Sequence, residues 1–166
     1  MGGAWVYVDR GQTHHIRNSE HFALERILVA DTNYRLVPTT DYKGQAADLA
    51  QAFRWLKDHA VEYGGDPNRI FLIGHSAGAH LVALLSSDDK YLKSVGLSLN
   101  DIAGYIASEN PQGKDQSQRL VKAPQEKERQ VETFIAQGDS QGSMFFGYSK
   151  ANDPEFGRIL EFIRAH

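Results

Sequence analysis

The sequence contains no cysteine among its 166 residues, and this absence excludes several kinds of protein. Without cysteine there is no disulfide framework, no thiolate nucleophile and no cysteine-based metal site. Basic residues are not in excess either, because 18 Lys and Arg stand against 21 Asp and Glu, for a formal net charge of −3. This balance argues against a nucleic-acid-binding protein, which needs a broad basic face to neutralise phosphates.

Long apolar runs are also absent. No stretch of about 18 apolar residues is present to span a membrane, and no basic region followed by an apolar one marks a secretory signal. We therefore expect no membrane span and a cytoplasmic location. The chain does have 41% hydrophobic and 23% charged residues, which is typical of a globular protein. Its length predicts one domain over residues 1–166.

Short apolar runs alternate with amphipathic stretches in the first two thirds of the chain. Buried strands are predicted for 26–31, 69–74 and, more weakly, 102–107. Helices are predicted for 44–62, where apolar residues recur at three and four, and for 79–85. Polar segments 11–20 and 33–42 are predicted to be loops. This alternation favours a parallel sheet with crossover helices.

The last third of the chain has a weaker pattern. Residues 109–130 are polar and fit a solvated helix or a linker, while 131–136 fit a strand. Helical spacing returns in 154–166, where Phe156, Ile159 and Ile163 form part of an apolar stripe.

The motif Gly74-His75-Ser76-Ala77-Gly78 lies between a predicted strand and a predicted helix. A G-x-S-x-G in this context is typical of a nucleophile elbow, a sharp turn that exposes the serine at the end of the strand. The glycines allow the strand and helix backbones to approach each other. The helix N-terminus then offers N–H groups to a developing oxyanion. The alternative is a strand-to-helix turn that needs glycines for its shape alone.

With this motif, three further segments resemble the α/β-hydrolase carboxylesterases and lipases of the hormone-sensitive-lipase and ferulate-esterase-like kind. They are Gly2-Gly3-Ala4-Trp5, residues 33–38 (NYRLVP) and residues 63–67 (YGGDP). The resemblance is good over 1–107, and 108–166 is shortened and divergent. It implies an α/β-hydrolase-like, mostly parallel sheet flanked by helices, with fewer strands than is usual in the family.

The resemblance also implies a site. Ser76 matches the nucleophile, and the backbone N–H groups of Gly3, Ala4 and Ala77 match the oxyanion hole. Asp115, in the segment Gly113-Lys114-Asp115, is the candidate for the acid of the triad. The implied reaction is hydrolysis of a small-molecule carboxylic ester through an acyl-enzyme on Ser76, without a cofactor.

The chain departs from the family pattern at the position of the catalytic base. The loop beginning at Gly138 matches the family's histidine loop, and the histidine position holds Gln141. Glutamine cannot accept and return a proton near neutral pH, so it cannot act as a general base. Three readings therefore remain open: a hydrolase with a substitute base such as His14 or His15, a catalytically impaired remnant, and a ligand-binding pseudoenzyme.

Two expectations concern partners. The adjacent His14 and His15 have no further ligand at metal-binding spacing, so no metal site is expected. A parallel sheet with few strands leaves an open edge and uncovered apolar faces. We therefore expect a homo-oligomer in which a second copy supplies the missing cover.

Overall fold

The computed structural model describes residues 13–109, 131–135 and 154–166. Three strands form a parallel sheet in the order β1-β2-β3: β1 (Phe71–His75), β2 (Gly104–Glu109) and β3 (Val131–Ile135). In the register, Phe71 lies opposite Gly104, and Tyr105 lies opposite Val131. The strands predicted near 69–74, 102–107 and 131–136 are confirmed, and so is their parallel arrangement.

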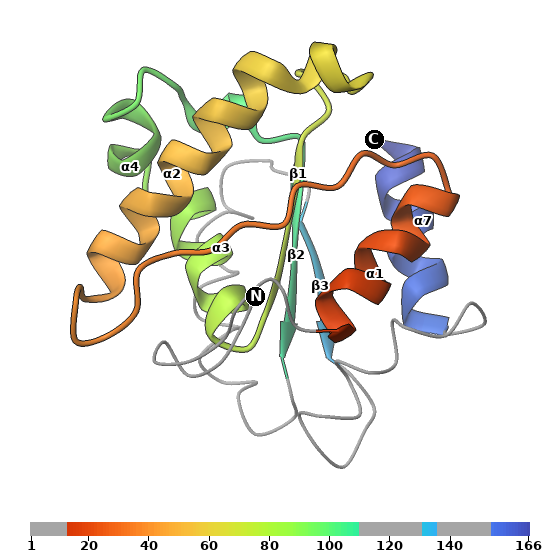
Figure 1. Cartoon of the computed structure of the whole chain (residues 1–166), viewed down its shortest axis with the longest axis horizontal. Helices are drawn as coiled ribbons and strands as arrows, with labels where there is room; N and C mark the ends of the chain where they lie inside the picture. Colours follow the sequence, from red (N-terminus) through yellow and green to blue (C-terminus); the bar gives the residue numbers. More distant parts are fainter. Residues whose placement is uncertain (1–12, 110–130, 136–153) are drawn as a thin grey trace.

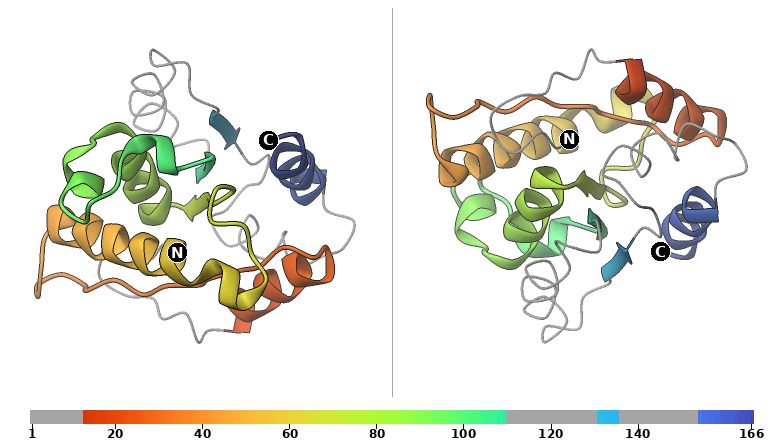
Figure 2. Two further views of the ribbon diagram at one scale, coloured as in Figure 1. Left: turned by 90° about the horizontal axis from the view of Figure 1, so that it is seen from above. Right: turned by 90° about the horizontal axis from the view of Figure 1, so that it is seen from below.

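Helices cover both faces of this sheet (Figure 1). One face carries α2 (Tyr42–His59), α3 (Ala77–Ser87) and the short α4 (Lys90–Lys93). The other face carries α1 (Thr13–Leu24) and α7 (Pro154–Ala165), which come from opposite ends of the chain and lie side by side in Figures 1 and 2. Two 3₁₀ turns, η1 (Ala60–Tyr63) and η2 (Leu99–Asp101), complete the described elements. The sheet is therefore the middle layer of three.

Alternate residues of β2 point to opposite faces of the sheet. Ile106 is fully buried in a cluster with Phe22 of α1 and the α7 residues Phe156 and Ile159. Its neighbour Tyr105 is buried in a second cluster with α3. A single central strand thus joins the two halves of the core.

The helix predicted for 44–62 is confirmed as α2 followed by η1. Asp41 begins it, because its side chain accepts hydrogen bonds from the backbone N–H groups of Lys43 and Gly44. Gly64 follows η1 with φ 80°, a left-handed conformation that glycine adopts without a steric cost. The loop before α2 is tied to it by Arg35, whose guanidinium donates to both carboxylate oxygens of Asp48.

The strand predicted for 26–31 is wrong. Arg26 has φ 62°, and the N–H of Ile27 donates to the carbonyl of Phe22 at 3.0 Å, so both residues belong to the C-terminal cap of α1. Residues 27–36 follow without forming a strand (Figure 1). An apolar run indicates burial, but a β-strand also needs a neighbouring strand with which to exchange hydrogen bonds.

The loop predicted for 11–20 is also wrong, because most of that segment lies in α1. The sequence of this segment is polar and contains histidines, so apolar periodicity does not indicate the helix. Residues 12–25 contain neither glycine nor proline, and this was the available signal for a helix. The fold is nevertheless the expected α/β class, with a parallel sheet flanked by helices. No helix among the described residues has the length and apolar character needed to cross a membrane.

Candidate active site

Ser76 lies between the end of β1 and the first residue of α3. It is thus at the carboxyl edge of the parallel sheet, where side chains from the ends of neighbouring strands can meet a ligand. The side chain is half-buried. The strand-turn-helix context expected for the G-x-S-x-G motif is present.

The backbone of Ser76 has φ 52° and ψ −123°, a region that residues with a side chain rarely adopt. Among the described non-glycine residues, Arg26 is the other with positive φ. Arg26 ends a helix, where a left-handed residue is common. Ser76 precedes a helix, where the flanking residue is normally extended. The strain at Ser76 therefore has no explanation in helix capping.

The hydroxyl of Ser76 is also not used by the helix it precedes. Serine is a favoured N-cap residue because its oxygen can accept a hydrogen bond from the second or third N–H of the helix. Ser76 makes no such side-chain bond. Its carbonyl does accept from the N–H of His80 at 3.2 Å, which is the first helical bond of this turn. In this conformation the hydroxyl of Ser76 takes no part in capping α3.

Gly74 allows β1 to pass close to the first turn of α3. A Cβ atom added at Gly74 would lie 2.3 Å from the carbonyl oxygen of Gly78 and 2.7 Å from the N atom of Ala79. Both contacts are with backbone atoms, which cannot rotate away. The two glycines of the motif therefore meet across the turn, as the sequence predicted.

Ala77 is buried at 3% exposure and is the first residue of α3. The first N–H groups of a helix have no carbonyl one turn earlier to bond. The positive end of the helix dipole adds to the partial charge of these groups. The N–H of Ala77 is consequently suited to stabilise negative charge that develops beside Ser76.

Two histidines flank the serine in sequence. His80, one turn along α3, is half-buried, and burial lowers the pKa of its imidazole below the ordinary value, so its neutral form is favoured. His75 is half-buried and lines a cavity beside β1.

The structure places Ser76 and Ala77 of the expected site. Gly3, Ala4, Asp115 and Gln141 lie outside the described residues. His14 and His15 lie in α1, and the structure describes their backbone but not their side chains.

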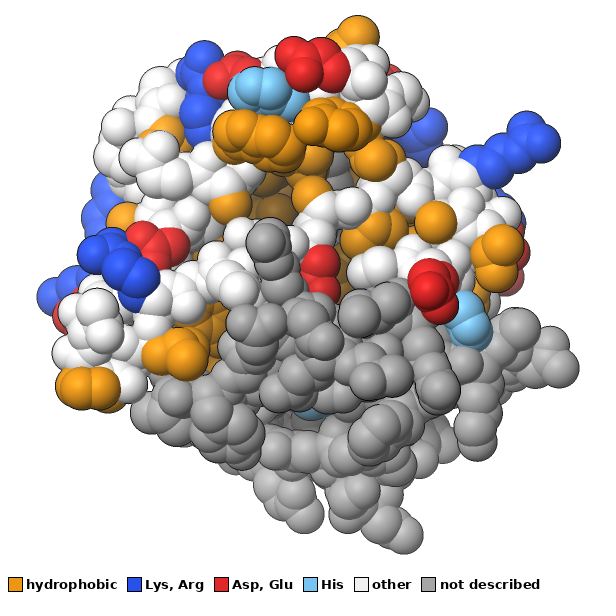
Figure 3. Space-filling model, in the orientation of Figure 1, with side chains coloured by type: hydrophobic (Ala, Val, Ile, Leu, Met, Phe, Trp, Pro, Cys, Tyr) orange, Lys and Arg blue, Asp and Glu red, His pale blue; other side chains and the backbone are white. Residues whose placement is uncertain are grey.

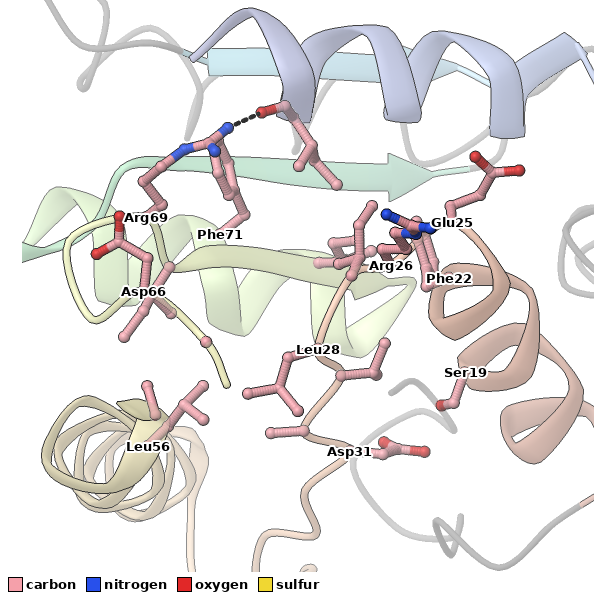
Figure 4. Close-up of a pocket in the computed structure, with 18 of the residues that line it drawn as sticks. Ser19, Phe22, Glu25, Arg26, Leu28, Asp31, Leu56, Asp66, Arg69 and Phe71 are labelled. Carbon is pink, nitrogen blue, oxygen red and sulfur yellow. Dashed lines mark hydrogen bonds between the residues drawn. The ribbon is translucent and has the colours of Figure 1, made fainter. Parts of the chain in front are cut away.

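The sequence reading missed a cavity of 530 Å³ that runs along β1. Figure 4 shows its lining, with Phe22, Leu28 and Leu56 coming from three different segments. The apolar character of 26–31 is the available signal, but an apolar run predicts a buried strand as readily as the wall of a cavity. The same residues instead form one wall of the cavity.

The sequence model of the BD-FAE family matches residues 1–95. The probable carboxylic ester hydrolase LipM of Mycobacterium tuberculosis is 39% identical over 84 residues, which cover 50% of this chain and 19% of LipM. The isoprenylcysteine alpha-carbonyl methylesterase ICME of Arabidopsis thaliana is 34% identical over 111 residues, covering 63% of this chain and 25% of ICME. The match thus spans a quarter or less of these relatives.

Two solved structures have a fold similar to that of this chain. A putative carboxylesterase from Lactobacillus plantarum aligns with a TM-score of 0.74 at 14% identity, covering 99% of this chain and 86% of that protein. Esterase B from Lactobacillus rhamnosis aligns with a TM-score of 0.68 at 20% identity, covering 99% and 72%. At these identities the likeness establishes the α/β-hydrolase architecture.

Proposed function

The chain belongs to the BD-FAE family, and we propose that it is a serine hydrolase that cleaves small carboxylic esters through an acyl-enzyme on Ser76. The observation that carries this proposal is the strained backbone of Ser76, at φ 52° and ψ −123°, with a hydroxyl that makes no capping bond. Strained non-glycine residues persist where the surrounding structure holds them, and such residues cluster at active sites. The esterase names of the relatives support the same reaction class.

In the first step, the Oγ of Ser76 attacks the carbonyl carbon of the ester, and a C–O bond forms as a general base takes the proton of the hydroxyl. The carbonyl oxygen becomes an oxyanion in the tetrahedral intermediate. Collapse of this intermediate breaks the bond to the alkoxy group, which leaves as the alcohol after taking up a proton. Water then attacks the acyl-enzyme, releases the carboxylic acid and restores the hydroxyl.

The oxyanion is stabilised in this scheme by backbone N–H groups. Ala77 supplies one from the start of α3, and the resemblance assigns the others to Gly3 and Ala4. Donors fixed in advance need no rearrangement as the charge develops, and each is worth about 10² to 10³ in kcat in a well-studied protease. Asp115 is proposed as the acid of the triad on the same resemblance.

Because Gln141 occupies the histidine position, the expected rate of ester hydrolysis is low. Removal of the histidine from a serine protease triad costs about 10⁶ in kcat, and about 10³ to 10⁴ over the uncatalysed rate remains from the oxyanion hole and binding. If no other group acts as base, the protein is a pseudoenzyme that holds an ester or its acid without turnover. Gln141 is the observation that favours this second candidate.

The test is release of p-nitrophenol from p-nitrophenyl butyrate by the unaltered protein, Ser76→Ala and Gln141→His. Ser87→Ala is the matched control, because Ser87 lies on the same helix and its hydroxyl bonds the carbonyl of Leu84. Turnover that is lost in Ser76→Ala and kept in Ser87→Ala supports the hydrolase. Activity that appears only in Gln141→His supports a scaffold inactivated at one position.

A fluorophosphonate probe identifies the nucleophile directly, through a covalent bond to the reactive serine. The Oγ of an activated serine displaces fluoride from the phosphorus of the probe, and the protein gains the mass of the remaining phosphonyl group. Labelling at Ser76, mapped by peptide mass spectrometry, supports the assignment. Labelling elsewhere, or equal labelling of Ser76→Ala, would show that Ser76 is not the nucleophile.

A further inference from the structure

The carboxyl ends of three parallel strands meet at the edge of the sheet that carries Ser76. Ser76 follows β1 directly, Glu109 is the last residue of β2, and β3 ends at Ile135. In Figure 1 these strand ends lie at the same end of the sheet as the first turn of α3. Residues at the carboxyl ends of the strands are the ones that meet a ligand in open α/β sheets. The topology therefore places a serine and a glutamate on neighbouring strand ends.

The register places Glu109 at the level of Ser76. His75, the last residue of β1, lies opposite Ser108, and Glu109 is the next residue along β2. On its other side β2 continues its pairing with β3 to this point, because Glu109 lies opposite Ile135. Neighbouring strands are about 4.8 Å apart, a distance that a glutamate side chain can span.

Ser76 needs a proton acceptor before its oxygen can attack an ester. The sequence after β3 has Gln141 where the family resemblance implies histidine, and a neutral amide does not take up a proton near neutral pH. An ionised carboxylate has only acceptor oxygens, and Glu and Asp are among the general bases of enzymes. Glu109 therefore has the chemistry that Gln141 lacks.

Three other titratable residues close to Ser76 are less well placed. His75 and Asp31 line the cavity beside β1, whose described lining includes no residue of β2. His80 lies on α3, which runs back along the sheet from the edge (Figure 1). Four residues of an α-helix rise about 6 Å, so the backbone of His80 lies away from the edge. Of these residues, Glu109 is the one on a strand that pairs with β1 at the level of the serine.

The described surface seen in Figure 3 has no broad patch of one charge. Its Lys and Arg side chains lie among Asp and Glu side chains, and the whole chain has a formal net charge of only −3. A strong field at a site requires clustered charge of one sign. Proton transfer at Ser76 therefore depends on groups at the sheet edge itself.

Building on the serine hydrolase proposed above, we propose that Glu109 is the general base for Ser76. In acylation the Glu109 carboxylate takes the proton of the Ser76 hydroxyl as the bond from Oγ to the carbonyl carbon forms. The carboxyl group then gives this proton to the alkoxy oxygen as the tetrahedral intermediate collapses and the alcohol leaves. In deacylation the carboxylate takes a proton from the attacking water and returns it to Oγ as the acid is released. Each cycle restores both residues.

The test is the rate at which a fluorophosphonate labels Ser76 in the full chain, followed by the mass of the intact protein. The proton of Oγ must be taken up as fluoride leaves, so this rate depends on the base and requires no ester. General bases contribute about 10² to 10⁴ in rate, and Glu109→Gln should label at least about 100-fold more slowly. Glu62→Gln is the matched control, because Glu62 is exposed and lies in η1, before β1 begins. This control should label at the unaltered rate.

A carboxylate added in solution separates base catalysis from a structural role. Formate supplies the acceptor group that Glu109→Ala lacks, and it should raise the labelling rate of this variant at least about tenfold. Sodium chloride at the same ionic strength should have no such effect. Neither salt should change the labelling rate of Glu62→Gln. Circular dichroism of each variant confirms that it folds.

Two results would overturn the assignment of Glu109. If Glu109→Gln labels as fast as the unaltered protein, another group is the base, and loss of labelling in His80→Gln or Asp31→Asn would identify it. If the unaltered protein does not label, Glu109 does not act as a base. Labelling of Gln141→His would in that case keep Ser76 as the nucleophile, whereas no labelling of any variant would overturn the proposed hydrolase as well.

Discussion

Gly74 and Gly78 lie so close across the turn at Ser76 that a methyl group on Gly74 would be 2.3 Å from the carbonyl oxygen of Gly78. Gly74→Ala should therefore force β1 and α3 apart and lower the free energy of unfolding by about 1–3 kcal/mol, the usual range for overpacking. Urea unfolding followed by circular dichroism measures this loss.

The control for this substitution is Gly157→Ala. Among the described residues, a Cβ added at Gly157 in α7 would have no atom within 4 Å apart from the local backbone of its own helix. Alanine is favoured over glycine inside a helix by about 1 kcal/mol. This variant should be as stable as the unaltered protein or more so. Equal stability of the two variants would contradict the close approach at the turn.

Ser76→Gly should stabilise the fold relative to Ser76→Ala. Both changes remove the hydroxyl, but only glycine adopts φ 52° and ψ −123° without strain. Strain of this kind costs about 1–3 kcal/mol, which exceeds the entropic disadvantage of glycine in the unfolded chain, about 1 kcal/mol. Differential scanning calorimetry of the two variants checks the order of their melting temperatures, and a lower value for Ser76→Gly would count against strain at this residue.

Phe22→Ala should cost about 3–5 kcal/mol of stability, the range for truncating a buried phenylalanine. Phe22 is 7% exposed, and its ring centroid lies 5.0 Å from that of Phe156, which joins α1 to α7. Leu24→Ala on the same helix should cost under about 0.5 kcal/mol, because Leu24 is 81% exposed. Chemical denaturation of both variants tests whether α1 packs on α7, and similar losses would argue against it.

Asp48→Asn should lower stability at neutral pH and have little effect in acid. Hydrogen bonds from Arg35 lower the pKa of the Asp48 carboxyl, which outweighs the opposing effect of burial. A carboxyl whose pKa is lower in the folded state stabilises the protein above its unfolded pKa of about 3.9. That contribution is lost as the pH falls through the folded pKa.

Melting temperatures between pH 2 and pH 7 check the pH dependence of this ion pair. The gap between Asp48→Asn and the unaltered protein should close on acidification. Asp58→Asn is the control, because Asp58 pairs with Arg54 on the exposed face of α2, and such pairs contribute little. A gap for Asp48→Asn that does not change with pH would show that the carboxylate charge has no role.

The elements that could be predicted from sequence are those whose signal is local. The spacing of Ala46, Leu49, Ala50 and Phe53 is helical, and three of these four residues are buried in one cluster of the core, with Leu49 packed against it. The G-x-S-x-G motif predicted the turn at Ser76 because the glycine contacts lie within five residues of each other.

Segment 26–31 shows that local composition does not predict strand pairing. Its composition is that of a strand, but a strand also needs a neighbour with which to exchange hydrogen bonds, and the neighbour is set by tertiary structure. The same reason limits the candidate site. Ser76 and Ala77 follow from one turn, whereas the base and the acid of a triad come from loops that only the fold can bring to the serine.

The parallel sheet has a consequence for how the chain folds. Phe71 pairs with Gly104, and Tyr105 pairs with Val131, so every strand pairing closes a long loop before it gains any hydrogen bond. Contacts so distant in sequence slow folding, and the exposed apolar strands of the partly folded chain are then prone to aggregate. Yield from refolding should accordingly fall with protein concentration, while slow dilution at low temperature should favour the native sheet.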